Sequence, residues 1–449
     1  MATVNTAIPG IFNVIDTEDY LKAAKQTADW ITAHEVTDVQ GTSWAVSCRE
    51  GKERDDVETV YLSNRTLYSG ASGIGFFFIQ LYEVTGEQKY LDEAKKGADY
   101  LIASYDPELS VKPGLHTGTS GEGFFLINLY KKTGNKEYLD QAVRIADDVY
   151  DKATKENGLI NYKGLFDYMG NGSVISYWIY VFNETSEKRF LDYAKICLDS
   201  ILNLRIEDDE NTIHWNFINI HDYFKEVPDN GIVANFAHGT SGIVYLLAQY
   251  YEASGDETYL ELAKKGVNFL DRIAIKDEDS SIIPYIYLPD SDKPYNVFYL
   301  SLCHGPVGTA VVFRKLYKLT GDEAYLEWVK RLSNSLIKAG VPEKRSSGYW
   351  NNCICCGTSG ILLHFSRNRD ILTGNINITL ARRTANKLVS DAYVDNRGRR
   401  WYDAWTRVKP WDVDSNLGLY IGDAGIASAL LSLYASIKGI KITEIPEFE

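Results

Sequence analysis

The sequence predicts an all-α fold, an (α/α)7 toroid in which seven inner and seven outer helices form one closed barrel domain over residues 1–449. Three observations lead to this prediction. A Gly-x-x-Gly element recurs along the chain, an apolar stretch of helical length follows each copy, and amphipathic stretches alternate with the apolar ones. Units of this kind bury their apolar faces against neighbouring units. Because the two kinds of stretch occur in equal number, no polar unit remains to cap an open array.

The Gly-x-x-Gly elements mark the expected starts of the inner helices. The intact copies begin at Gly70, Gly118, Gly239, Gly305, Gly357 and Gly422. A degenerate copy at residues 170–173 stands where the third is due. Glycines at a helix start let backbones approach closely and leave main-chain N–H groups free. By themselves they predict tight packing near an axis and no particular function.

The stretches after these elements, such as residues 76–82 and 244–251, are apolar on nearly all sides, so we expect them to be buried. A turn such as Thr85-Gly86 follows, where glycine is expected to cap the helix C-terminus. The amphipathic stretches have apolar residues at i, i+3, i+4 and i+7, which predicts half-exposed outer helices. They lie at residues 17–34, 89–101, 137–149, 189–202, 258–270, 324–336 and 378–393.

Long connections are expected at about 205–235, 275–303, 340–354 and 395–420, each leading from an outer helix to the next inner one. They should gather on the face where the inner helices begin, and loops over one end of a scaffold are where sites are usually built. The turn-rich segments 36–66 and 395–409 are expected to add short strands there.

The composition excludes several classes of protein. A hydrophobic share of 45% supports a large core. The sequence contains no run of about 18 apolar residues, so no transmembrane segment is expected. The N-terminus lacks a basic stretch followed by an apolar one, so no signal peptide is expected. A net charge of −14 argues against a nucleic-acid partner. The six cysteines are no disulfide framework, and their clustering fits a metal site in a reducing compartment, here the cytoplasm.

The residues just before the first glycine of each repeat carry the functional signal. In chain order they are Ser69, Thr117, Met169, His238, His304, Cys356 and Ile421. Cys303 and Cys355 each precede one of these by one position. Because the repeats fix the register, the helix starts should bring the three thiols together with His238 and His304 in one pocket. Three thiols around one zinc ion leave an open fourth position, which is typical of a catalytic site.

Two other interpretations of the thiols remain open at this point. They are buried packing residues, or they hold a structural zinc with Cys353 or His304 as the fourth ligand. We expect Cys353 to be a bystander and Cys197 an ordinary core residue. His116 is expected to line the pocket or to cap a helix, since its repeat is distant from the thiols.

At these motifs the chain resembles the LanC-like lanthionine synthetases, which are lanthipeptide cyclases of antibiotic biosynthesis. The motifs are Ala237-His238-Gly239, Leu302-Cys303-His304-Gly305-Pro306 and Cys355-Cys356-Gly357. Their order and spacing agree over essentially the whole chain. The resemblance implies an (α/α)7 barrel with one zinc ion, held here by Cys303, Cys355 and Cys356. Most members have Cys-His at the second cysteine motif, so this chain resembles the three-cysteine variant.

The resemblance also implies roles for individual residues. His238 falls at the position of the family's acid/base histidine, and Asp167 is the best match to its acidic residue, displaced by one position. His304, beside a ligand, is expected to stabilise enolate charge. Some bacterial members carry an arginine four residues before the first zinc cysteine. This chain has Tyr299 there, so that role is unfilled or taken by another residue.

The implied reaction adds peptide Cys thiols to dehydroalanine or dehydrobutyrine and closes (methyl)lanthionine rings. Zinc deprotonates a thiol whose free pKa is about 8.5, and a histidine that titrates near neutrality suits proton delivery to the α-carbon. The expected partners are a dehydrated precursor peptide with leader and core, a separate dehydratase, for which the chain has no room, and a transporter.

Three alternatives stay open from the sequence. The first is a LanC-like glutathione transferase that modifies dehydroamino acids in proteins, since residues 302–308 are close to the motif of such members. The second is a non-catalytic zinc or peptide-binding scaffold. The third, a toroidal glycosidase or lyase, would need paired carboxylates, whereas the pocket register holds thiols and imidazoles.

Overall fold

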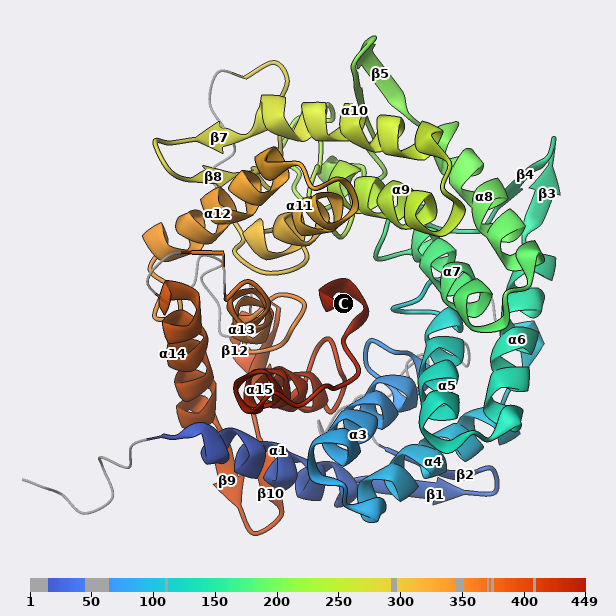
Figure 1. The fold of residues 1–449 in the computed structure, drawn as a ribbon, viewed down its shortest axis with the longest axis vertical. Helices are drawn as coiled ribbons and strands as arrows, with labels where there is room; N and C mark the ends of the chain where they lie inside the picture. The colour runs from blue at the N-terminus through green and yellow to red at the C-terminus, as the bar shows by residue number, and fades with distance from the viewer. Residues whose placement is uncertain are drawn as a thin grey trace, which may run out of the picture.

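A computed structural model describes residues 15–44, 64–109, 112–291, 297–344, 351–369, 371–372, 375–406 and 409–449. In this part of the chain, fourteen α-helices form two concentric rings (Figure 1). The inner helices are α3 (Ala71–Thr85), α5 (Ser120–Thr133), α7 (Val174–Thr185), α9 (Thr240–Ser254), α11 (Pro306–Thr320), α13 (Thr358–Arg367) and α15 (Asp423–Lys438). The outer helices are α1 (Thr17–Thr32), α4 (Gln88–Ala103), α6 (Lys136–Asp151), α8 (Lys188–Leu202), α10 (Glu257–Ile273), α12 (Glu323–Lys338) and α14 (Ile376–Asp391). The predicted all-α (α/α)7 toroid is confirmed.

The ring is closed by the two ends of the chain. Six outer helices pack against the inner helix that precedes each of them, while α1 packs against α15, and α15 also contacts α3. Asp423, the first residue of α15, accepts hydrogen bonds from Trp30 Nε1 (3.0 Å) and Ser415 Oγ (2.7 Å) with one oxygen and from Trp401 N (2.8 Å) with the other. Its carboxylate therefore joins α1 to α15 at the seam of the toroid.

The glycines explain how the inner helices come so close together. A Cβ on Gly308 would collide with the carbonyl oxygen of Leu302 and with Cβ of Phe236, which precedes the neighbouring inner helix. Gly86, at the C-terminus of α3, has φ +68°, a left-handed conformation that favours glycine, as the sequence predicts. The degenerate third element forms a short 3-10 helix, η2 (Asn171–Ser173), directly before α7.

Six short antiparallel hairpins decorate the described connections. They are β1 (Glu35–Asp38) with β2 (Gly41–Trp44), β3 (Thr154–Glu156) with β4 (Leu159–Asn161), β5 (Ile206–Asp209) with β6 (Thr212–His214), β7 (Ile275–Lys276) with β8 (Ser281–Ile282), β9 (Tyr393–Asp395) with β10 (Gly398–Arg400), and β11 (Asp403–Thr406) with β12 (Lys409–Asp414). The sequence predicted strands in two segments, 36–66 and 395–409, and residues 45–63 of the first segment lie outside the described residues. Strands β3 to β8 were not predicted, because strands of two to four residues are too short to show a clear alternation of polar and apolar residues. No helix in the described residues is long and apolar enough to span a membrane.

The final segment of the chain, residues 439–449, turns back from α15 into the middle of the ring (Figure 1). Gln80 Nε2 on α3 donates to the carbonyl oxygen of Thr443 (2.8 Å), and the Tyr245 hydroxyl on α9 donates to that of Pro446 (3.3 Å). The segment ends in the 3-10 helix η5 (Pro446–Phe448), so the bore of the toroid is occupied by the chain itself.

Candidate metal centre and active site

A girdle of main-chain hydrogen bonds links the segments that precede the inner helices. The bonds run from Tyr68 N to His116 O (2.9 Å), Tyr420 N to Tyr68 O (2.9 Å), Cys355 N to Tyr420 O (3.0 Å), Cys303 N to Cys355 O (3.1 Å), Ala237 N to Cys303 O (2.9 Å) and Met169 N to Ala237 O (2.9 Å). Between the second and third repeats, Leu115 N instead donates to Ser173 Oγ (2.9 Å). All seven repeats are thus linked around the axis, and the third is displaced by one residue, because its Met169 rather than Tyr168 enters the girdle.

The girdle sorts the residues at the start of each repeat into two layers. The floor layer comprises the girdle residues, which stand two positions before the first glycine, or one before it in the displaced third repeat: Tyr68, His116, Met169, Ala237, Cys303, Cys355 and Tyr420. All but the half-buried Tyr68 are buried. The rim layer comprises the residues that directly follow them: Ser69, Thr117, Gly170, His238, His304, Cys356 and Ile421. All of these are partly or fully exposed, so the rim layer faces the solvent above a buried floor.

Cys303, Cys355 and Cys356 form a thiol cluster in which all three sulfurs lie within 4.8 Å of one another. Cys303 Sγ lies 3.3 Å from Cys356 Sγ, which lies 3.6 Å from Cys355 Sγ. A tetrahedral zinc with bonds of about 2.3 Å would separate its sulfurs by about 3.8 Å. The cluster is therefore of the right size and chemistry to hold a zinc-like ion. The floor layer supplies two of its thiols and the rim layer supplies the half-exposed third.

The protons of the cluster are shared unequally. Hydrogen bonds from Cys355 and Cys356 hold the pKa of the Cys303 thiol well below its usual range, whereas the bond to Cys303 raises the pKa of Cys355 to about 12. One sulfur is therefore readily a thiolate, and a metal ion must displace the protons of the other two.

The two remaining described cysteines lie outside the cluster. The Cys353 sulfur is buried and accepts a hydrogen bond from Cys356 N (3.5 Å), so it helps to shape the loop that carries two of the clustered thiols. Cys197 is buried within α8, where burial raises the pKa of its thiol.

Asp167 and His238 form a pair that joins the third repeat to the rim layer of the fourth. His238 Nδ1 lies 2.9 Å from Asp167 Oδ2, and Asp167 Oδ1 accepts from Gly170 N (2.6 Å). The Asp167 side chain is fully buried, whereas that of His238 is 28% exposed. Burial lowers the pKa of His238, but the hydrogen bond and charge of Asp167 outweigh this and raise it above the usual value. The pair fixes the imidazole with Nδ1 towards the carboxylate, so that Nε2 is the nitrogen left for other partners.

His304 lies beside His238, with their ring centroids 5.4 Å apart. It packs against Tyr285 (4.6 Å) and Tyr299 (5.6 Å), and both tyrosines are buried. They belong to a small apolar cluster that joins the long connections near 205–235 and 275–303, together with Ile218, Ile220, Val227, Val233 and Ile286. Tyr299, at the position where some family members have arginine, is thus part of an aromatic group beside His304.

Two parts of this site were missed in the sequence. The Tyr68 side chain lies close to the Cys355 thiol, and the nearby thiols and burial raise the pKa of its hydroxyl well above the usual value. Its position two before Gly70, the register of Cys303 and Cys355, is the signal that could have found it. Tyr285 lies in a long connection outside the repeats and carries no such signal. His116 is buried, away from the thiols, and pairs with Glu447 (2.6 Å).

Comparison with known proteins agrees with this architecture. The fold is similar to that of nisin cyclase, with 14% identity, a TM-score of 0.66 and coverage of 95% of both chains. A sugar epimerase from a ruminal bacterium is also similar, with 14% identity, a TM-score of 0.50 and coverage of 95% of this chain and 99% of that one. At such identities the likeness concerns the fold alone. No curated protein sequence matches significantly.

A family model described as "Lanthionine synthetase C-like protein" matches residues 62–442, which is most of the chain. This range contains all seven inner helices, the thiol cluster and the Asp167–His238 pair. The chain therefore belongs to the lanthionine synthetase C-like family.

Proposed function

We propose that this protein is a zinc-dependent lanthipeptide cyclase, which adds peptide Cys thiols to dehydroalanine or dehydrobutyrine to form (methyl)lanthionine rings. The observation that carries the proposal is the thiol cluster beside a carboxylate-paired histidine at the half-exposed rim. Family membership and the likeness to the fold of nisin cyclase support it. This chain has thiols and imidazoles at the pocket register rather than paired carboxylates, which favours thiol chemistry over glycoside chemistry.

Cys303, Cys355 and Cys356 would hold one zinc ion. When bound, zinc lowers the pKa of the substrate thiol and presents it as a thiolate nucleophile. Three protein thiolates leave the site more negative than two thiolates and a histidine. The nucleophile should therefore be more electron-rich and should exchange more readily.

His238 is proposed as the acid of the reaction. The substrate sulfur bonds to the β-carbon of the dehydro residue, the C=C π pair moves towards the carbonyl, and His238 Nε2 protonates the α-carbon of the resulting enolate. The thiol proton leaves when the thiolate forms, so atoms and charge balance without any oxidant. Asp167, which is hydrogen-bonded to His238, would orient it and stabilise its charged form, and His304, beside His238, would stabilise enolate charge.

The proposed substrate is a dehydrated precursor peptide with leader and core, supplied by a separate dehydratase and passed on to a transporter. Three clustered free thiols need a reducing environment, which favours action in the cytoplasm.

The test compares the purified chain with its Cys356→Ala and Cys353→Ala variants. The second is a matched control, because Cys353 lies in the same loop but outside the cluster. Metal content is quantified for each protein. Cyclisation leaves the peptide mass unchanged, so ring formation in a dehydrated Cys-containing peptide is followed as loss of alkylatable thiols.

We expect one zinc per chain in the wild type and in Cys353→Ala, and loss of both metal and thiol consumption in Cys356→Ala. A wild type without zinc would return the cysteines to packing. Glutathione incorporation into the dehydro residues in preference to ring closure would favour the glutathione transferase. Peptide binding that persists without zinc and without thiol consumption would favour the scaffold.

A further inference from the structure

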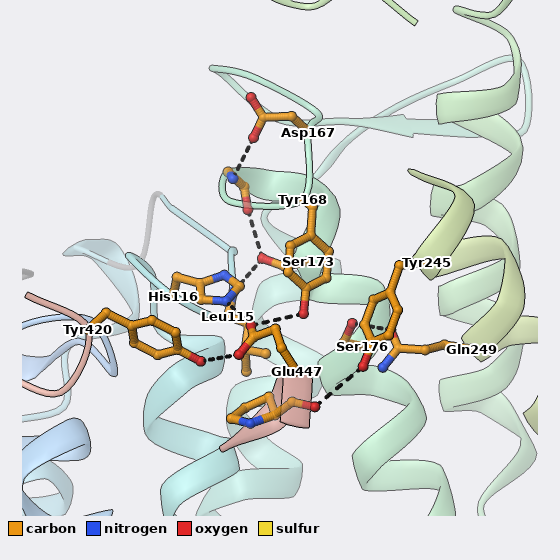
Figure 2. A network of polar contacts seen from close by, with 12 residues as sticks. Leu115, His116, Asp167, Tyr168, Ser173, Ser176, Tyr245, Gln249, Tyr420 and Glu447 are labelled. Atoms are coloured by element: carbon orange, nitrogen blue, oxygen red, sulfur yellow. Dashed lines mark hydrogen bonds and ion pairs between the residues drawn. The ribbon is translucent and has the colours of Figure 1, made fainter. Parts of the chain in front are cut away.

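A buried carboxylate from the final segment of the chain reaches the underside of the active site. Glu447 lies in η5, and its side chain is completely buried. Its Oε1 lies 2.6 Å from His116 Nε2 and accepts from the Tyr168 hydroxyl (3.0 Å), while its Oε2 accepts from the Tyr420 hydroxyl (2.6 Å) (Figure 2). Both oxygens are therefore engaged, as a buried carboxylate requires.

Two partners of Glu447, His116 and Tyr420, belong to the floor layer, which also provides Cys303 and Cys355, and the third, Tyr168, directly precedes its Met169. The three partners come from the second, third and seventh repeats. The site thus has one carboxylate beneath its floor that bonds to three separate repeats at once. Burying a carboxylate with a histidine is costly, and apolar residues of similar size often stabilise a fold as well. What these directional hydrogen bonds add is a fixed relative position of the three side chains that Glu447 joins.

The hydrogen-bond network of Glu447 reaches the thiol cluster through Tyr420. The carbonyl oxygen of Tyr420 accepts from Cys355 N (3.0 Å). The ring of Tyr420 stacks on Tyr68, with centroids 5.7 Å apart and planes within 4°, and Tyr68 in turn lies close to the Cys355 thiol. A shift of Tyr420 would therefore displace the main-chain contact of Cys355 and the side chain that stacks between Tyr420 and this thiol.

The Glu447 carboxylate is also connected to the Asp167–His238 pair, through Tyr168. This residue directly follows Asp167, and its ring packs against Phe236, with centroids 4.6 Å apart. Phe236 lies two residues before His238. Figure 2 shows Asp167 above Tyr168, while the Tyr168 hydroxyl points down to Glu447. The two halves of the candidate site thus share one support.

We propose that Glu447 is a positioning residue of the active site, which fixes the floor layer from below and so sets the geometry of the thiol cluster and of the Asp167–His238 pair. The inference rests on the proposed function for its catalytic readout only. Glu447 touches no reacting atom, and its effect is carried by His116, Tyr168 and Tyr420.

The segment has other anchors, so a substitution at Glu447 should not release it. Thr443 N donates to Glu83 Oε2 (2.6 Å), Gln80 and Tyr245 bind the carbonyl oxygens described above, and Lys318 Nζ donates to the main-chain oxygen of Glu449 (2.8 Å). Glu449 is near Tyr180 rather than the floor layer, so Glu449→Gln is a matched control in the same segment.

The experiment uses the full chain and its Glu447→Gln, Glu447→Ala and Glu449→Gln variants. The probe is Co²⁺, whose thiolate charge-transfer and d–d absorption report ligand geometry. Zinc affinity is measured by competition with a chromogenic chelator, and kcat and KM with the dehydrated peptide. We expect Glu447→Ala to weaken zinc binding about tenfold, the lower end of the effect of losing an outer-shell partner. Its cobalt spectrum should change and its kcat should fall at nearly constant KM, with a smaller effect in Glu447→Gln and none in Glu449→Gln.

A Glu447→Ala protein with wild-type spectrum, affinity and kcat, and only a lower melting temperature, would overturn the proposal and leave Glu447 a stability residue. Equal effects from Glu449→Gln would also overturn it, because they would show a loosened segment. If the wild type binds no metal, the proposed function fails separately. The rate of alkylation of Cys303 and Cys355 then decides: faster labelling in Glu447→Ala supports positioning, and an unchanged rate refutes it.

Discussion

Replacing Asp167 by asparagine should reverse the hydrogen bonding of His238. Asp167 Oδ1 accepts from Gly170 N (2.6 Å), so the amide oxygen of an asparagine must face that N–H. The amide NH₂ would then face His238 Nδ1, which has to become an acceptor. The proton moves to Nε2, the charged imidazole loses its partner, and His238 becomes a poorer acid.

The expected size of the effect follows from the contact that is lost. The bond between His238 and Asp167 (2.9 Å) joins a fully buried carboxylate to an imidazole that is charged in the reaction. Hydrogen bonds to charged groups are worth about 1.5–3 kcal/mol. At about 1.4 kcal/mol per tenfold change in rate, kcat/KM should fall about 10- to 100-fold. Metal content should not change, because Asp167 touches none of the clustered thiols.

The pH profile provides a second readout with a definite sign. A histidine that donates its proton loses activity as the pH rises through its pKa. The hydrogen bond and charge of Asp167 raise the pKa of His238 against the opposing effect of burial, so the asparagine variant should have a lower pKa. The alkaline limb of kcat/KM should therefore move to lower pH.

The assay is the pH dependence of thiol loss in a dehydrated Cys-containing peptide. Asp229→Asn is the matched control, because it alters an exposed pair with His221 (3.5 Å) and should change neither rate nor profile. An Asp167→Asn protein with wild-type kcat/KM and an unmoved alkaline limb would refute the assignment of His238 as the Asp167-supported acid.

Cys356→His should keep one zinc and activity within about tenfold of wild type, since most family members have histidine there; metal analysis showing an empty site would contradict the ligand assignment. Gly308→Ala should lower the free energy of unfolding by about 2 kcal/mol in urea titration, because its Cβ has no room between the Leu302 carbonyl oxygen and the Phe236 side chain, and an unchanged midpoint would refute this packing argument. Asp423→Ala should cost about 3 kcal/mol, because Trp30 Nε1 and two other donors at the seam lose their acceptor. Asp92→Ala, on the exposed face of α4, should lower the free energy of unfolding by less than about 0.5 kcal/mol. Equal losses of stability in Asp423→Ala and Asp92→Ala would argue against a special role for the seam.

The sequence by itself determined the toroid and the register of its helix starts. Both depend on local signals that repeat: all-apolar inner helices, amphipathic outer helices and glycines where backbones touch. Because the same backbone geometry recurs in each repeat, placing Cys303 and Cys355 two positions before a glycine was enough to predict that they would meet. The family resemblance added Asp167 as a candidate.

Only the tertiary structure decided what surrounds those thiols. The Asp167–His238 contact joins residues 71 positions apart, and the His116–Glu447 contact joins residues 331 apart. Tyr285 and Tyr299 reach His304 from a connection of irregular length. None of these contacts follows from the spacing of the repeats. Each depends on which residues are brought together by the closed ring and by the irregular segments that cover or enter it, although those residues lie far apart in the chain.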